Sequence, residues 1–130
     1  METSANEPRK RRVLIVDDNV DLGWFFQEIL KLHGYDASVL HNGEEALKQL
    51  LQNPADAVIC DLQMPQLDGD LLYATVERTN PALARRFIFV TGEADDPRFS
   101  KFVSTVEAPV LRKPVAVESL LDAVGRIANG

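Results

Sequence analysis

The 130-residue chain has a single cysteine, Cys60, and no apolar stretch long enough to cross a bilayer. One cysteine excludes an internal disulfide and is typical of proteins from a reducing compartment. The first residues mix acidic, basic and polar side chains, which is unlike a secretory signal peptide. Internal repeats and low-complexity segments are also lacking. We therefore expect a cytoplasmic protein that makes no contact with a membrane.

Net positive charge is lacking as well. The chain has 14 Lys and Arg against 20 Asp and Glu, and its net charge is −6. An acidic domain of this kind is not expected to bind nucleic acid directly. The exception is the run Arg9-Lys10-Arg11-Arg12, which is too short to indicate DNA or membrane binding. We interpret residues 1–12 as a flexible basic lead.

The remaining residues, 13–128, alternate short apolar runs with segments of helical periodicity. The predicted strands are residues 13–16, 35–40, 55–60, 87–90 and 109–111. The predicted helices are residues 20–32, 44–51, 70–79, 97–106 and 117–128. Strands and helices that alternate with short connections predict one α/β domain, in which helices cover both faces of a parallel sheet.

Apolar residues in the helical segments recur every three or four positions, which predicts that one face of each helix packs on the sheet. In helix 20–32 the predicted inward residues are Leu22, Phe25, Phe26, Ile29 and Leu32. In helix 70–79 they are Leu71, Leu72 and Val76. The outward side of helix 20–32 is predicted to hold Val20, Gly23, Trp24 and Gln27. Trp24, the only tryptophan, is either a ring lying partly buried across a neighbour or a docking anchor for a partner protein.

Polar residues stand where four of the five predicted strands end. They are Asp17 and Asp18 after the first strand, Asp61 after the third, Thr91 after the fourth and Lys113 after the fifth. Each one alone could simply begin a solvated loop or cap a helix. Their repetition favours a shared site, because the carboxyl ends of parallel strands meet at one edge of the sheet.

The residue types at this edge indicate phosphoryl transfer. Clustered carboxylates repel one another, and a hard cation such as Mg²⁺ relieves that repulsion and keeps places for phosphate oxygens. Lys113 would supply a point charge for an anionic group, and the Thr91 hydroxyl would supply a hydrogen-bond donor. With Asp61 as a carboxylate nucleophile, these groups make up a phosphoryl-transfer site.

Four stretches resemble the motifs of response-regulator receiver domains, which act in two-component phosphorelay signalling. They are Val16-Asp17-Asp18, the segment from Asp61-Leu62-Gln63-Met64-Pro65 to Asp68-Gly69, Thr91-Gly92, and Lys113-Pro114. The resemblance extends from Val13 to about Ala128. It implies a flavodoxin-like fold, in which a doubly wound five-stranded parallel sheet of order 2-1-3-4-5 is surrounded by five helices.

The resemblance also implies a role for each site residue. Asp61 would accept a phosphoryl group from a phosphohistidine of a sensor kinase or phosphotransfer protein. Asp18, Asp61 and the backbone carbonyl of Gln63 would bind Mg²⁺, and Asp17 would act through water. Lys113 would pair with the phosphoryl group. In this family the bond between this lysine and the following proline is cis.

Further implied roles concern switching. Thr91 would move to hydrogen-bond the phosphoryl group, and Gln63 and Glu93 would tune its lifetime. Val110 occupies the switch position, where the family often has a tyrosine or phenylalanine that rotates inward, so an aromatic relay is not expected here. The outward surface of helix 20–32, with Val20, Trp24 and Gln27, would dock the kinase or phosphotransfer protein. A downstream protein would bind the face made by helix 97–106, strand 109–111 and helix 117–128.

The overall expectation is a signalling switch, rather than a conventional enzyme, whose only catalysis is its own phosphorylation and dephosphorylation at Asp61. A stand-alone receiver with no output domain is the leading form, and a receiver excised from a hybrid histidine kinase is the alternative. An aspartyl phosphatase of the haloacid-dehalogenase type is disfavoured, because Gln63 stands where a second acid is needed. A nucleotide-binding module is disfavoured because no glycine-rich loop follows the first strand.

Overall fold

The computed structural model describes residues 9–92 and 96–130. Its five strands form one parallel sheet of order β2-β1-β3-β4-β5, which confirms the predicted flavodoxin-like topology. The strands are β1 (Arg12–Val16), β2 (Asp36–Leu40), β3 (Ala57–Asp61), β4 (Phe87–Thr91) and β5 (Val110–Arg112). The helices of the described part are α2 (Val20–Leu32), α3 (Gly43–Gln52), α4 (Gly69–Thr79), α5 (Pro81–Ala84), α6 (Pro97–Thr105) and α7 (Val117–Asn129).

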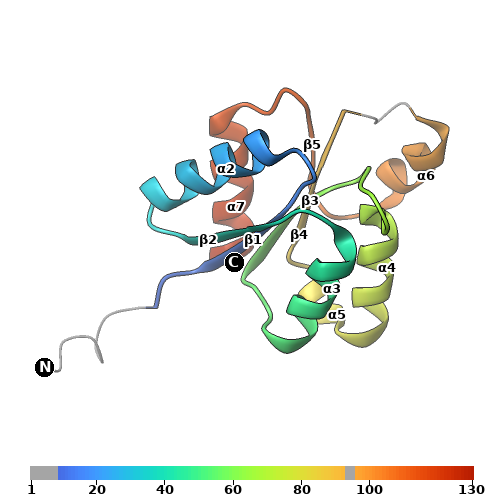
Figure 1. Ribbon diagram of the computed structural model, residues 1–130, viewed down its shortest axis with the longest axis horizontal. Helices are drawn as coiled ribbons and strands as arrows, with labels where there is room; N and C mark the ends of the chain where they lie inside the picture. Colours follow the sequence, from blue (N-terminus) through green and yellow to red (C-terminus); the bar gives the residue numbers. More distant parts are fainter. Residues whose placement is uncertain (1–8, 93–95) are drawn as a thin grey trace, which may run out of the picture.

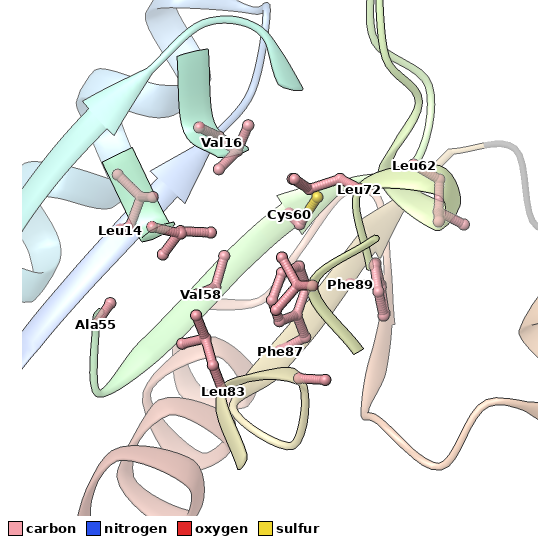
Figure 2. Close-up of a cluster of buried hydrophobic side chains, with 14 of the residues drawn as sticks. Leu14, Val16, Ala55, Val58, Cys60, Leu62, Leu72, Leu83, Phe87 and Phe89 are labelled. Atoms are coloured by element: carbon pink, nitrogen blue, oxygen red, sulfur yellow. The ribbon is translucent and has the colours of Figure 1, made fainter. Parts of the chain in front are cut away.

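The sheet lies between two layers of helices (Figure 1). Helices α2 and α7 cover one face, where their buried residues pack on Val13, Ile15, Ile59 and Val90. Helices α3, α4, α5 and α6 pack on the other face, whose strand residues include Leu14, Val58, Phe87 and Phe89. Figure 2 shows this second cluster, with Val58 and Cys60 of β3 beside Phe87 and Phe89 of β4. Strands β3 and β4 are buried along their whole length because both of their faces are covered.

Residues 9–92 and 96–130 hold six helices, one more than the five predicted. Asn80 and Pro81 were expected only to stop helix 70–79, but they also begin the short helix α5. Asn80 ends α4, and its side chain then accepts a hydrogen bond from the backbone N–H of Leu83. Proline fits the first turn of a helix because that turn needs no N–H donor from it. None of the helices in the described part is long and apolar enough to span a membrane.

At four positions the observed burial is the opposite of the predicted helix face. Leu32 is 82% exposed, and Phe25 and Leu71 are also exposed, although all three were expected to face the sheet. Gly23 was expected outward but is buried, and a Cβ at this position would meet Cγ1 of Val39 at 2.9 Å. The buried stripe of α2 runs through Gly23, Phe26 and Leu30. The missing side chain of Gly23 lets α2 lie close to β2, and this rotates Phe25 and Leu32 away from the core.

Candidate functional site

Three carboxylates meet at the carboxyl edge of the sheet. Strands β1 and β3 are neighbours, so Asp17, directly after β1, lies beside Asp61, the last residue of β3. Each of Asp17, Asp18 and Asp61 presents an oxygen within 4.8 Å of the others. Asp17 is 2% exposed and Asp61 is 6% exposed, whereas Asp18 is open to solvent. The topology therefore gathers these acids into one group, with two of them buried.

Lys113 reaches this group from the end of β5. Its Nζ donates a hydrogen bond to Oδ2 of Asp61 at 3.0 Å and lies 3.9 Å from Oδ2 of Asp17. The backbone N–H of Lys113 donates to the carbonyl of Thr91 at 2.9 Å, which ties the end of β5 to β4. The Lys113-Pro114 peptide bond is cis. The lysine side chain is thus held against two acids that come from other strands.

The electrostatics reflect an excess of negative charge. Burial and, second to it, the charge of Asp17 raise the pKa of Asp61, while Lys113 lowers it, and the net result is a pKa of about 6. Burial also raises the pKa of Asp17, against a hydrogen bond from the backbone N–H of Asn19 and the charge of Lys113. Burial alone would lower the pKa of Lys113, but its contacts with Asp61 and Asp17 outweigh this and the pKa is raised. One lysine does not neutralise three acids, so a proton or cation is favoured here.

The loop from Asp61 to α4 has an unusual backbone. Gln66 has a φ of 72°, and the N–H of Leu67 donates to the carbonyl of Pro65, which together define a γ-turn of the strained kind. The Asp68 carboxylate accepts a hydrogen bond from the N–H of Met64 at 3.0 Å. The N–H of Gly69 donates to the carbonyl of Leu62 at 2.8 Å.

Gly69 brings the first turn of α4 against the backbone of Asp61. A Cβ at residue 69 would overlap the carbonyl oxygen of Asp61 and would lie 3.0 Å from Sγ of Cys60. Glycine is therefore required by close approach, and it helps to fix where Asp61 lies. Asp68-Gly69 belongs to one of the motifs of the family resemblance, but the sequence shows no sign of this contact.

These residues surround a cleft of about 670 Å³. Its lining is Asp18, Asn19, Asp61, Gln63, Met64, Pro65, Asp68, Gly92, Arg98 and Lys113. Thr91 is buried at the end of β4, next to Gly92. Glu93, for which a tuning role was expected, lies outside the described residues.

Asn19 and Arg98 were not among the predicted site residues. Asn19 begins α2, and Arg98 lies in the first turn of α6. Both follow strands that end at this edge of the sheet. Since a helix that follows a parallel strand starts at the strand's carboxyl end, the first turn of each such helix is a place to search for site residues.

The predicted docking surface on α2 is only partly as expected. Trp24 is 60% exposed and Val20 is also exposed, in agreement with an outward position. Gln27 was expected outward but is half-buried, and its Nε2 donates a hydrogen bond to the carbonyl of Ala37 at 3.0 Å. A glutamine can reach the edge of the sheet from a position beside the buried stripe, so Gln27 ties α2 to β2.

Val110, at the predicted switch position, is half-buried and pairs in register with Phe89. The ring of Phe102, from α6, lies perpendicular to that of Phe89, with the ring centroids 5.0 Å apart. Tyr73, from α4, contacts Phe102 edge-on at 5.7 Å. Val110 packs against the same cluster. Aromatic rings from the helices therefore occupy the region beside the valine.

Comparison with known proteins places these features in a family. A family model described as the response regulator receiver domain matches residues 13–125. The response regulator receiver protein Anae109_2439 of Anaeromyxobacter sp. (strain Fw109-5) is 35% identical over 112 residues, which are 86% of this chain and 46% of that protein. The sensor histidine kinase TmoS of Ectopseudomonas mendocina is 30% identical over 118 residues, 91% of this chain and 12% of that protein.

A solved structure is similar over almost its whole length. The signal receiver domain of an HD domain-containing protein from Pseudomonas fluorescens Pf-5 superposes with a TM-score of 0.81 and is 26% identical. The match covers 93% of this chain and 96% of that one. By contrast, this chain spans less than half the length of the two curated relatives.

Proposed function

This chain belongs to the response regulator receiver domain family, and we propose that it is a phosphorylation-dependent switch whose phospho-acceptor is Asp61. The observation that carries the proposal is the contact between Nζ of Lys113 and Oδ2 of Asp61, at 3.0 Å, in a cleft shared with Asp18. A carboxylate held by a cation in an open cleft is suited to attack a phosphoryl group.

In the proposed reaction, a carboxylate oxygen of Asp61 attacks the phosphorus of a phosphohistidine on a sensor kinase or phosphotransfer protein. A P–O bond to Asp61 forms while the P–N bond breaks, and the electron pair of that bond leaves on the imidazole nitrogen. Lys113 pairs with the charge of the transferred phosphoryl group. In the reverse step of the switch, water attacks the phosphorus, and the Asp61 carboxylate leaves as inorganic phosphate forms. The protein thus acts only on itself and is not a conventional enzyme.

The acidic residues fit a magnesium ion. Three carboxylates present oxygens within 4.8 Å of one another, and hard oxygen ligands of this kind suit Mg²⁺. Asp18, Asp61 and the backbone carbonyl of Gln63 would hold the ion, and Asp17 would contact it through water. When bound, Mg²⁺ would neutralise negative charge on the phosphoryl oxygens.

We place the tuning and switching roles on the residues around the cleft. Gln63 lies on its wall, where its side chain can influence attack by water on the phosphoryl group, and Glu93 is proposed for the same role. Thr91 would hydrogen-bond the phosphoryl group. Val110 has no polar tip that could report phosphorylation by rotating. We propose that the conformational change on phosphorylation instead alters the face formed by α6, β5 and α7, where a downstream protein would bind. This output would involve no direct contact with nucleic acid or a membrane.

For the upstream partner we propose docking on α2. Val20 and Trp24 are large apolar side chains that remain exposed on α2, the helix that begins at the cleft residue Asn19. Aromatic residues are favoured at the centres of interfaces. A cytoplasmic location fits this role. That the receiver works on its own stays a prediction, as does the alternative that it belongs to a hybrid histidine kinase; one relative is itself named a sensor histidine kinase.

The direct test is incubation of the protein with phosphoramidate or acetyl phosphate and magnesium, followed by intact mass measurement. We expect one phosphoryl adduct in the wild type and none in Asp61→Asn. Asp17→Asn is a useful second variant, because it removes a neighbouring acid and leaves the proposed acceptor. An adduct that persists in Asp61→Asn, or no adduct from small donors or a kinase, would refute the assignment.

A further inference from the structure

The first turn of α6 places a second cation on the wall of the cleft. Arg98 lines the cleft together with Asp61 and Lys113, although it comes from a different element than either of them. Asp96, the N-cap of α6, accepts a hydrogen bond from the N–H of Arg98 at 2.9 Å. This fixes the backbone of Arg98 at the edge of the sheet. No role for this residue follows from the motifs in the sequence.

Within residues 9–92 and 96–130, the guanidinium of Arg98 has only weak partners. Its Nη2 donates a long hydrogen bond to Oδ2 of Asp96 at 3.3 Å, and its Nη1 lies 3.9 Å from Oδ2 of Asp68, which is too far for a hydrogen bond. The group also lies over the ring of Phe99, 4.8 Å from the centroid. The side chain is 53% exposed, and ion pairs as exposed as this contribute little. An anion that enters the cleft can therefore replace Asp68 at little cost.

Asp68 does not depend on Arg98. Its other carboxylate oxygen, Oδ1, accepts a hydrogen bond from the N–H of Met64, and the residue stands at the N-cap position of α4 without a side-chain capping hydrogen bond. Loss of the 3.9 Å contact to Arg98 would leave this hydrogen bond in place. Arg98 thus links the first turns of α4 and α6 through its contact with Asp68, and neither residue depends on this contact for its position.

The charge in the cleft explains why a second cation is useful. Lys113 already donates to Asp61 and lies near Asp17, so its charge is shared before any donor arrives. A phosphoryl donor brings further negative charge into a cleft that holds three acids. An arginine suits this task because its planar fork of five N–H donors matches phosphate oxygens, and the Arg98 guanidinium makes one side-chain hydrogen bond to the part of the chain that the structure describes.

We propose that Arg98 binds the phosphoryl oxygens of the incoming donor and draws it into the cleft for attack by Asp61. The inference rests on the proposed function, because it concerns the substrate of that same reaction. Arg98 contributes charge and hydrogen bonds and exchanges no proton. With phosphoramidate as donor, the P–O bond to Asp61 forms, the P–N bond breaks, and the nitrogen leaves as ammonia with the electron pair.

The experiment compares phosphorylation rates of the full chain with phosphoramidate and magnesium, measured by intact mass at several donor concentrations. The variants are Arg98→Ala, Arg98→Lys and Lys101→Ala. Lys101 is the matched control, because it is an exposed cation on the same helix that does not line the cleft. For Arg98→Ala we expect the rate constant per donor concentration to fall about fivefold, as the loss of one partly exposed charge-assisted hydrogen bond implies. The rate constant of Arg98→Lys should lie between those of the wild type and Arg98→Ala.

Salt gives a second readout that depends on charge rather than on folding. Added salt should slow phosphorylation of the wild type and of Lys101→Ala more steeply than that of Arg98→Ala. Salt screens the attraction between Arg98 and the anionic donor, and Arg98→Ala lacks this attraction. Equal rates in Arg98→Ala and the wild type would overturn the inference, and so would equal losses in Arg98→Ala and Lys101→Ala. These outcomes differ from failure of the proposed function, in which the wild type itself would gain no phosphoryl group at Asp61.

Discussion

Replacement of Asp61 by asparagine should make the metal-free protein more stable at neutral pH, although it removes the proposed phospho-acceptor. Burial and the neighbouring Asp17 raise the pKa of Asp61 from 3.8 to about 6. The Asp61 carboxylate therefore binds a proton more tightly in the folded state than in the unfolded chain. A tenfold difference in proton affinity corresponds to about 1.4 kcal/mol, so ionised Asp61 destabilises the fold by about 3 kcal/mol at pH 7.

The sign of the pH dependence follows from the same comparison. Well below pH 3.8, the pKa of the unfolded chain, Asp61 is protonated in both states and carries no penalty. Between about pH 4 and 6 the folded state binds more protons than the unfolded state, so stability falls as the pH rises. Above about pH 6 the full penalty remains. The pKa of about 6 already includes the attraction between Lys113 and the ionised carboxylate. Asparagine keeps the shape without the charge, so we expect a net gain of up to about 3 kcal/mol at pH 7.

The assay is urea unfolding of wild type and Asp61→Asn with a chelator, at pH values from 4.5 to 7.5. The difference in free energy of unfolding should grow with pH and level off above pH 6. Asp122→Asn is the control, because Asp122 is an exposed acid whose ion pair with Arg126 lies on the surface. A wild type as stable as Asp61→Asn at pH 7, or a difference that does not change with pH, would refute the reasoning.

Three further predictions concern the metal, the loop and the docking surface. Magnesium at about a hundred times its dissociation constant should stabilise the wild type by about 2.7 kcal/mol, and Asp18→Asn should show a much smaller rise in melting temperature; equal rises would mean that Asp18 is not a ligand. Gly69→Ala should cost roughly 1–3 kcal/mol in urea unfolding because its Cβ overlaps a backbone carbonyl, whereas Gly125→Ala, whose Cβ has room, should be neutral or stabilising by up to about 1 kcal/mol. Trp24→Ala should slow phosphotransfer from a phosphohistidine protein while labelling by phosphoramidate stays unchanged, and Leu71→Ala, an exposed apolar residue on α4, should affect neither; equal losses with both donors would contradict docking through Trp24.

The sheet could be predicted from the sequence because its strands are short apolar runs separated by clear turn residues. Once the strands are parallel, the polar residues at their ends must meet at one edge. The approach of Lys113 to Asp61 follows from that rule without knowledge of any distance. The family resemblance supplied the strand order, which the alternation of elements alone does not determine.

Packing between helices and sheet was less predictable, for physical reasons. The position of α2 depends on Gly23, and a residue without a side chain leaves no mark in a pattern of apolar residues. Gln27 is polar, yet it is used to reach a backbone carbonyl of β2. The bridge from Arg98 to Asp68 joins residues thirty positions apart and depends on where two helices begin. Such contacts are set by tertiary geometry rather than by local periodicity.

The aromatic cluster beneath α6 determines what kind of movement can carry a signal. Every second residue of a strand faces the same side of the sheet, so Phe89 of β4 lies on the same face as Thr91. Phe102 packs against both Phe89 and Tyr73, which also contact each other, while Val110 has no ring to rotate. A shift at Thr91 would therefore move α6 as a rigid body instead of changing the rotamer of one side chain. In a nuclear magnetic resonance titration, the chemical shift changes should spread along α6 and not concentrate at residue 110.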